Sequence, residues 1–307
     1  MTTLSAGPAG RPGRPFGTTL TAMVTPFTAT GELDVDAAGQ LAERLVAAGN
    51  NGLVVNGTTG ESPTTTDAEK DLVIRAVVEA VGDRATVVAG VGTYDTAHSV
   101  RLAKAAEKAG AHGNLVVTPY YSRPQQEGLL AHFAAVADAT DLPVMLYDIP
   151  PRSVVAIAPD TLLRLAEHPR ITAVKDAKGD LLAGSKVIAG SDLAYYSGDD
   201  PLTVPWMSIG AVGIVSIIAH VVGPHVRAMV DAAEAGNYAT ARKLHEVLLP
   251  AHRAMGRTGS GAGLVFAKTA LRLQGFGVGD PRLPQIPATH TQTDLIAKDM
   301  DEIGPLQ

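Results

Sequence analysis

The sequence contains no cysteine in 307 residues. This absence excludes disulfide bridges, thiolate metal sites, iron–sulfur clusters and cysteine nucleophiles, and it is compatible with a cytoplasmic protein. Aromatic residues make up only 4% of the chain, so we expect a core built mainly from alanine, valine, leucine and isoleucine. Lysine and arginine number 25 against 31 acidic residues, which gives a net charge of −6. Because no basic surplus is available to neutralise phosphates, nucleic-acid binding is not expected.

Metal-binding and membrane-spanning patterns are also missing. The nine histidines are scattered, with no His-x-His or His-Glu-x-x-His spacing, so no metal site is expected. Residues 1–15 are rich in glycine, proline and arginine and lack the apolar run of a secretory signal, so we expect a disordered extension. The uncharged stretch from Pro201 to Val226 contains prolines, glycines and histidines, which argues against a membrane span.

Short apolar runs alternate with longer amphipathic segments along the chain. Most of the eight runs are continuously apolar, which is typical of parallel strands covered on both faces. Between them, residues 34–48 follow the helical spacing of apolar positions, and residues 66–69 form a capping box that begins another helix. The predicted strands are Thr19–Val24, Leu53–Asn56, Thr86–Val91, Asn114–Thr118, Val144–Asp148, Thr172–Lys175, Ala194–Ser197 and Val212–Ser216.

One glycine-rich junction recurs before three of these strands. The pattern Gly-x-x-Gly occupies residues 49–52, 110–113 and 210–213, where the first glycine suits a left-handed helix end and the second a tight entry into the sheet. The repeated βα unit predicts a (β/α)8 TIM barrel, with a doubly wound open sheet as the alternative. Since the strand signal then stops, we predict a barrel over residues 16–235 and a small C-terminal helical region over 236–307.

Active sites of such barrels lie at the C-terminal ends of the strands, where this chain places Lys175 and Tyr147. Burial disfavours the ammonium form of a lysine, and the neutral amine is a nucleophile for carbonyls. The alternative is a structural lysine paired with Asp148 or Asp176. Tyr147 ends the neighbouring strand, where its phenol is either a proton shuttle or a core group. Lys268 is a weaker candidate nucleophile, because we expect its ammonium to reach the surface from a late helix.

Three more segments at strand ends carry candidate binding groups. Residues 57–60 (Gly-Thr-Thr-Gly) offer backbone N–H groups and two hydroxyls, which suit a small carboxylate unless the segment is a plain turn. The pattern of a phosphate-binding P-loop is missing there. Arg152 follows two prolines that stiffen its loop, and it is either a carboxylate clamp or part of a surface ion pair. Residues 199–201 (Asp-Asp-Pro) are predicted to cap a helix rather than bind a metal.

Together these segments resemble the dihydrodipicolinate synthase family of pyruvate-dependent class I aldolases, and in particular its actinobacterial members. The resemblance extends from about Gly17 to Leu283 and depends on the order and spacing of motifs at the strand ends. The matching motifs are Gly57-Thr58-Thr59-Gly60-Glu61-Ser62, Pro119-Tyr120-Tyr121, Tyr147-x-x-Pro150-x-Arg152, Val174-Lys175-Asp176 and Ser197-Gly198-Asp199-Asp200.

The resemblance implies a role for each of a small set of residues. Lys175 would form a Schiff base with pyruvate, and Tyr147 would act as general acid and base. Thr59 would relay the proton to Tyr121, which in the family reaches in from a neighbouring subunit. Thr58 and Thr59 would bind the pyruvyl carboxylate through their backbone N–H groups.

The same resemblance implies the second substrate, the product and the assembly. Arg152 would hold the carboxylate of L-aspartate 4-semialdehyde, and the carbonyls of Gly198 and Val215 would line the pocket. The product would be 4-hydroxy-tetrahydrodipicolinate, on the route to diaminopimelate and lysine, made without a cofactor. The family also implies small-molecule substrates as the only partners besides copies of the same chain, arranged as a homotetramer, a dimer of dimers.

Three positions depart from the family pattern, the mildest being Val215 in place of the more usual isoleucine. Pro151 stands where glycine or serine is usual and Val154 where glycine is common. A pyruvate aldolase for a sugar acid or a secondary metabolite therefore stays an alternative, as does a non-catalytic binding barrel. Members inhibited by lysine carry asparagine and glutamate at the positions of Tyr94 and His98, so weak or absent inhibition by lysine is expected.

Overall fold

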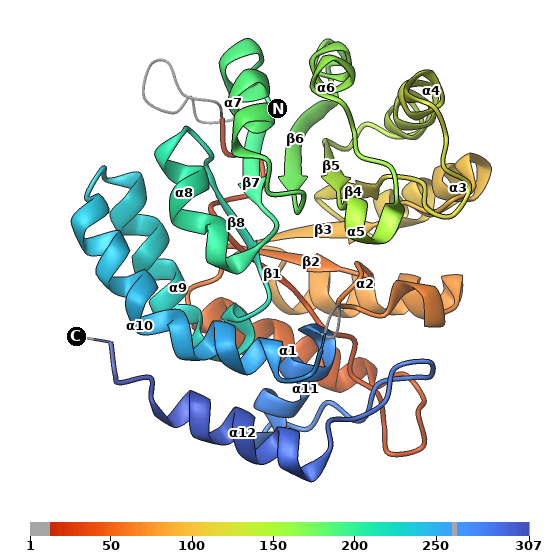
Figure 1. The fold of residues 1–307 in the computed structure, drawn as a ribbon. Helices are drawn as coiled ribbons and strands as arrows, with labels where there is room; N and C mark the ends of the chain where they lie inside the picture. The colour runs from red at the N-terminus through yellow and green to blue at the C-terminus, as the bar shows by residue number, and fades with distance from the viewer. Residues whose placement is uncertain (1–12, 260–262, 307) are drawn as a thin grey trace.

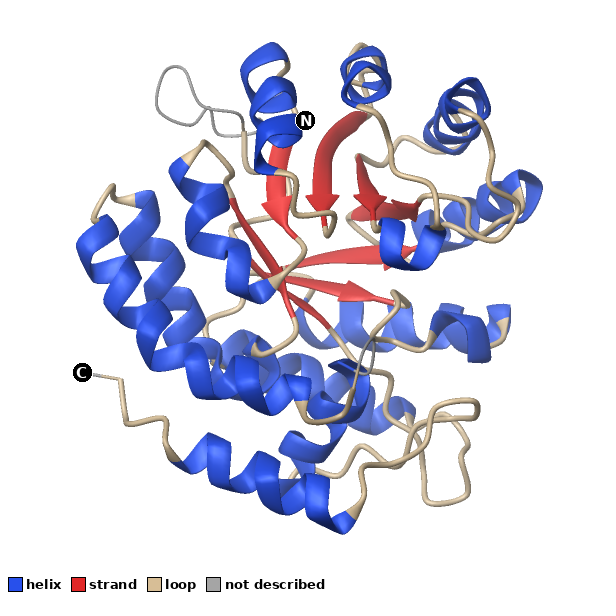
Figure 2. Cartoon of the chain, in the orientation of Figure 1, coloured by secondary structure: helices blue, strands red, loops and turns tan. Residues whose placement is uncertain are grey.

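The computed structural model describes residues 13–259 and 263–306, so the predicted disordered extension lies outside the described residues as far as residue 12. Eight parallel strands pair in chain order, and the last closes onto the first. The strands form an inner ring surrounded by helices (Figures 1 and 2), which confirms the predicted (β/α)8 barrel. The strands are β1 (Thr19–Ala22), β2 (Gly52–Val55), β3 (Thr86–Gly90), β4 (Gly113–Val117), β5 (Val144–Asp148), β6 (Ile171–Asp176), β7 (Ala194–Ser197) and β8 (Gly213–Ser216).

Helices follow the strands and continue beyond the barrel. The bounds of β5 and β7 agree with the sequence prediction, and the other strands differ from it by one or two residues at one or both ends. The capping box at Thr66 and Glu69 is formed at the start of α2. The helices are α1 (Val35–Ala47), α2 (Asp67–Val81), α3 (Thr96–Lys108), α4 (Gln126–Ala137), α5 (Pro150–Ser153), α6 (Pro159–Leu165), α7 (Leu181–Gly190), α8 (Thr203–Ser208), α9 (Ala219–Glu234), α10 (Tyr238–Gly256), α11 (Gly263–Leu273) and α12 (His290–Asp301), with short 3-10 turns at η1 (Ser62–Thr64) and η2 (Asp200–Leu202).

Two apolar clusters form the core. Side chains of a strand point alternately to opposite faces. In β5, Met145 and Tyr147 belong to the smaller cluster, which fills the barrel interior together with Leu20 and Tyr196. Leu146 joins the larger cluster between the strands and the helices. This alternation decides which strand-end side chains face the barrel mouth and which face the helices.

The three Gly-x-x-Gly junctions have the predicted geometry. The first glycine of each is left-handed, as at Gly49 with φ of 98°. The second enters the sheet where no side chain fits, because a Cβ on Gly213 would lie 1.9 Å from the carbonyl oxygen of Thr18. Glycine is therefore required twice in each turn, and the turns place successive strands in one closed sheet.

The helices after the barrel cover one side of it. Helix α9 ends at Glu234 and α10 begins at Tyr238, and α10 packs along α9. Helix α12 lies against α10 and α11 (Figure 1). Among the described residues, no helix combines the length and the apolar character that a membrane crossing requires.

Candidate active site

Tyr147 and Lys175 lie side by side at the C-terminal ends of adjacent strands. They are register partners in the β5–β6 ladder, and each is 5% exposed. The Lys175 Nζ atom lies 4.2 Å from the centroid of the Tyr147 ring. A phenol and an amine thus share one small buried space at the barrel mouth.

The carboxylates next to these residues point away from the barrel mouth. Asp148 pairs with Lys178 Nζ at 3.1 Å, and Asp176 accepts a hydrogen bond of 2.6 Å from the Tyr195 hydroxyl. Within the described residues, no carboxylate forms an ion pair with Lys175. The structural role considered for Lys175, a pairing with Asp148 or Asp176, is therefore wrong, because alternate strand residues face opposite sides.

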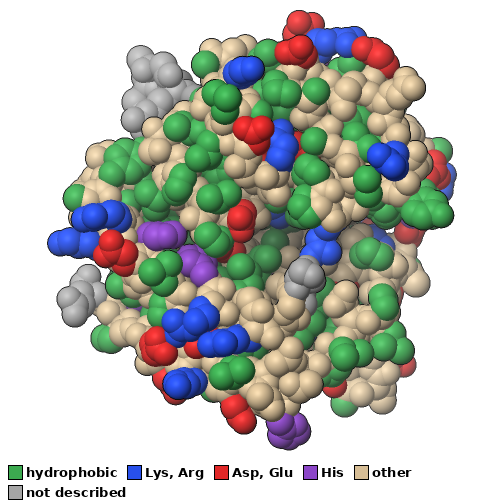
Figure 3. Space-filling view, in the orientation of Figure 1, with side chains coloured by type: hydrophobic (Ala, Val, Ile, Leu, Met, Phe, Trp, Pro, Cys, Tyr) green, Lys and Arg blue, Asp and Glu red, His purple; other side chains and the backbone are tan. Residues whose placement is uncertain are grey.

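Two adjoining cavities open at this end of the barrel, where the face in Figure 3 is hollowed near its centre. The smaller, of about 90 Å³, contains Lys175 and is lined by Thr58, Thr59, Tyr147, Ile149, Arg152, Lys175, Gly198, Ile217, Gly263 and Leu264. The larger, of about 210 Å³, is lined by Asn56, Gly57, Thr58, Ser62, Pro63, Gly90, Gly92, Leu115, Val117, Tyr120, Tyr147, Ile149, Arg152 and Ser153. Thr58, Tyr147, Ile149 and Arg152 line both, so the two cavities form one site.

The turn after β2 lines the smaller cavity with two residues whose backbone N–H groups are unpaired. Its ends are closed by hydrogen bonds from Glu61 N to Thr58 O and from Ser62 N to Gly57 O. In the part of the chain that the structure describes, the N–H groups of Thr58 and Thr59 have no acceptor. Two free backbone donors beside one small cavity suit a carboxylate.

Arg152 enters both cavities from the short helix α5. Asp148 holds the loop that carries it, since Asp148 Oδ1 accepts a hydrogen bond of 3.1 Å from Ile157 N and Oδ2 accepts one from Lys178 Nζ. Burial raises the pKa of Asp148 to about 6, although Lys178 opposes the shift. Val154 keeps a φ of 68°, so the loop retains the backbone shape of a glycine there at some cost in strain.

The remaining predicted site residues are only partly brought together. Gly198 lines the smaller cavity. Val215 is buried in β8 and does not line either cavity, whereas Ile217 lines the smaller one. Tyr121 is 91% exposed and left-handed at φ 72°, so its hydroxyl lies outside the site of its own chain.

Comparisons with known proteins identify the family of this chain. The Dihydrodipicolinate synthetase family model matches residues 15–303. The chain belongs to this family. Its relatives include the 4-hydroxy-tetrahydrodipicolinate synthase of Mycolicibacterium gilvum, 61% identical over 93% of each chain. A second is 4-hydroxy-tetrahydrodipicolinate synthase 2 of Streptomyces coelicolor, 59% identical over 95% of this chain and 97% of that one.

Solved structures of the family share the fold. The dihydrodipicolinate synthase of Bacillus anthracis is 43% identical, with a TM-score of 0.90 over 94% of this chain and 99% of that one. The Acinetobacter baumannii enzyme complexed with pyruvate is 32% identical, with a TM-score of 0.89 over 94% and 99%. Among the described residues, no group of three acidic or histidine side chains is arranged to hold a metal.

The structure corrects one sequence interpretation and refines another. Lys268 is fully buried and paired with Glu61 at 2.7 Å instead of reaching the surface, because α11 packs against the turn after β2. Asp199 is the N-cap residue of η2, and Pro201 stands in its first turn as predicted, but the Asp199 side chain makes no capping hydrogen bond. Asp200 instead accepts hydrogen bonds from Ser216 Oγ and, at 2.8 Å, from Ile217 N, which fixes the turn after β8. Burial raises the pKa of Asp200.

Sequence reasoning missed several residues that shape the site. Tyr120 lines the larger cavity and meets the ring of Tyr94 edge to face, with centroids 5.5 Å apart. Ile149 and Ile217 supply apolar walls. Tyr120 stood in the matched motif Pro119-Tyr120-Tyr121, but no role was assigned to it. Nothing in the local sequence marked the two isoleucines.

Proposed function

We propose that this chain is a 4-hydroxy-tetrahydrodipicolinate synthase that condenses pyruvate with L-aspartate 4-semialdehyde through a Schiff base on Lys175. The observation that carries the proposal is the pairing of Lys175 with Tyr147, in register and beside the unpaired N–H groups of Thr58 and Thr59. Relatives at about 60% identity bear this enzyme name. No observation favours the sugar-acid aldolase.

The first half of the reaction uses the smaller cavity. The pyruvate carboxylate binds the N–H groups of Thr58 and Thr59, which places the C2 carbonyl against Lys175 Nζ. The neutral amine adds to C2, and loss of water gives the imine, with Tyr147 donating the proton that leaves with the oxygen. The Tyr147 phenolate then takes a proton from C3, which gives the enamine and restores the phenol.

The second half joins the aldehyde. The enamine C3 attacks the aldehyde carbon of the semialdehyde, whose carboxylate is held by the Arg152 fork, and Tyr147 protonates the new alkoxide. The amino group of the semialdehyde then attacks C2. This closes the ring, breaks the bond to Lys175 Nζ and returns the free amine.

The proton on Tyr147 needs a route to solvent. We assign this relay to Thr59 and to Tyr121 of a neighbouring subunit, since Tyr121 is 91% exposed in its own chain. A shared Tyr121 requires at least a dimer, and we propose a homotetramer in the cytoplasm.

Thr58 lines both cavities and Thr59 only the smaller, so the matched variants Thr58→Val and Thr59→Val test which hydroxyl carries the proton.

Borohydride reduction in the presence of pyruvate tests the chemistry. The reduced pyruvyl group should map to Lys175 by mass spectrometry and be missing in Lys175→Arg. A coupled assay then compares aspartate semialdehyde with sugar aldehydes. An enzyme that forms no adduct contradicts the Schiff-base step, preference for a sugar aldehyde supports the other aldolase, and an adduct without turnover supports a binding barrel.

A further inference from the structure

The turn that presents Thr58 and Thr59 is held in an unfavourable backbone conformation. Asn56 and Glu61, at its two ends, are left-handed at φ of 56° and 57° without being glycine. Such residues persist only where surrounding contacts overcome the strain. Asn56 donates its side-chain amide to Lys70 O at 3.1 Å, and Thr25 Oγ1 donates to Gly60 O at 2.6 Å. These tethers hold the turn at Asn56 and at Gly60, next to its second end.

The other end is held by a carboxylate that faces the C-terminal region. Glu61 is 3% exposed, and its Oε1 lies 2.7 Å from Lys268 Nζ on α11. Its Oε2 accepts a hydrogen bond of 2.8 Å from the backbone N–H of Arg282. Lys268 Nζ also donates to Asp280 O at 3.2 Å and lies 4.3 Å from the centroid of the Phe27 ring.

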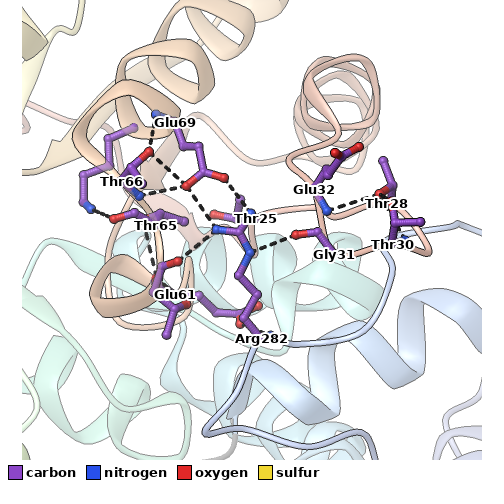
Figure 4. A network of polar contacts seen from close by, with 12 residues as sticks. Thr25, Thr28, Thr30, Gly31, Glu32, Glu61, Thr65, Thr66, Glu69 and Arg282 are labelled. Carbon is purple, nitrogen blue, oxygen red and sulfur yellow. Dashed lines mark hydrogen bonds and ion pairs between the residues drawn. The ribbon is translucent and has the colours of Figure 1, made fainter.

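The Arg282 side chain contacts the segment that follows the turn (Figure 4). Its guanidinium donates to both carboxylate oxygens of Glu69, at 2.5 and 3.0 Å, and to Thr64 O at 2.9 Å. It also donates to Gly31 O and lies 4.2 Å from the Phe27 ring centroid. Phe27 thus packs against both cations, and the C-terminal region contacts the turn at Glu61 and the segment after it at Thr64 and Glu69.

Stability alone does not account for a fully buried lysine–glutamate pair. Removing two charges from water costs free energy that their attraction often fails to recover, so a pair of apolar residues would stabilise the fold at least as well. The pair instead fixes the backbone of Glu61. Because Glu61 N donates to Thr58 O, this also fixes the orientation of the N–H groups of Thr58 and Thr59.

We propose that Lys268 and Arg282 are positioning residues for pyruvate, acting through Glu61 to aim the N–H groups of Thr58 and Thr59 at the pyruvate carboxylate. The proposal rests on the function assigned to the turn above. It makes the C-terminal region part of the pyruvate site, although Lys268 does not line either cavity.

The variant Lys268→Met keeps the length of the side chain and removes its charge. We measure the pyruvate concentration that half-saturates borohydride trapping, and KM for each substrate. Misaligned donors weaken charge-assisted hydrogen bonds to the carboxylate, so pyruvate half-saturation and the pyruvate KM should rise about tenfold. The KM for the aldehyde, held by Arg152, should change less than twofold.

A matched variant separates positioning from general loss of stability. Lys178→Met also removes one cation from a buried ion pair, but that pair braces the Arg152 loop on the other side of the site. It should raise the aldehyde KM and leave pyruvate half-saturation within twofold. The double variant Glu61→Gln/Lys268→Met removes both charges of the first pair and should recover part of the lost pyruvate affinity.

The proposed function and the positioning role of Lys268 fail on different results. If wild-type protein forms no adduct, the proposed function fails. If wild type forms the adduct and Lys268→Met traps pyruvate with unchanged half-saturation, or raises both KM values alike, the positioning role is overturned. If Lys268→Met does not fold, Arg282→Met replaces it, since the backbone N–H to Glu61 remains, and a smaller rise confined to pyruvate is expected.

Discussion

The buried pair of Asp148 and Lys178 allows a prediction in which stability depends on pH. The Asp148 side chain is fully buried, and that of Lys178 is 15% exposed. With Lys178 present, burial still raises the pKa of Asp148 from 3.8 to about 6. In Lys178→Met the carboxylate loses its counter-charge, so we expect it to stay protonated in the folded state at neutral pH.

The size of the destabilisation in Lys178→Met follows from the difference between the pH and the pKa of Asp148. Below pH 6, Asp148 is neutral in both proteins, and the variant loses only contacts of the lysine, about 1 kcal/mol. Above pH 6 the wild-type pair is ionised, and the variant must hold a proton at a cost of about 1.4 kcal/mol per pH unit. The added destabilisation therefore reaches about 3 kcal/mol at pH 8.

Proton binding by Asp148 decides whether stability falls or rises with pH. Asp148 has a raised pKa in the folded state, so its contribution to stability is present below pH 3.8 and is lost as pH rises through the folded pKa. In wild type this loss ends near pH 6. In the variant the folded pKa is higher, so its stability continues to fall up to pH 8.

Urea unfolding at pH 5, 6.5 and 8, at one protein concentration, measures the difference. The double variant Asp148→Asn/Lys178→Met carries no charge at either position and should lose the pH dependence. A destabilisation of Lys178→Met that is equal at pH 5 and pH 8 would refute the assigned charge state of Asp148.

Three further predictions concern the barrel, the relay and regulation. Gly213→Ala should destabilise the fold by about 3 kcal/mol or more, because its Cβ meets the backbone of Thr18, and an unchanged thermal midpoint would contradict the assigned geometry. Tyr121→Phe should lower kcat about 100-fold and leave borohydride trapping by Lys175 intact; wild-type turnover would remove Tyr121 from the relay. With Tyr94 and His98 in place, millimolar lysine should leave initial rates nearly unchanged, and sharp inhibition below 1 mM would contradict this expectation.

The sequence was sufficient for the fold and for the central pair of the site. Both follow from local rules. Continuous apolar strands, glycine turns and helical periodicity are short-range patterns, and the strand period of two places Tyr147 and Lys175 on the same interior face. Once a barrel was predicted, the general rule that barrel active sites lie at the C-terminal ends of the strands located the site.

Only the tertiary structure decided the partners of the charged groups. The sequence favoured a surface position for Lys268 and considered Asp148 for Lys175, whereas Lys268 meets Glu61 and Asp148 meets Lys178. Ion pairs join segments distant in the chain and depend on how helices pack, which no local periodicity encodes. For the same reason the exposure of Tyr121, which points its hydroxyl toward a neighbouring subunit in our proposal, became visible only once the chain was folded.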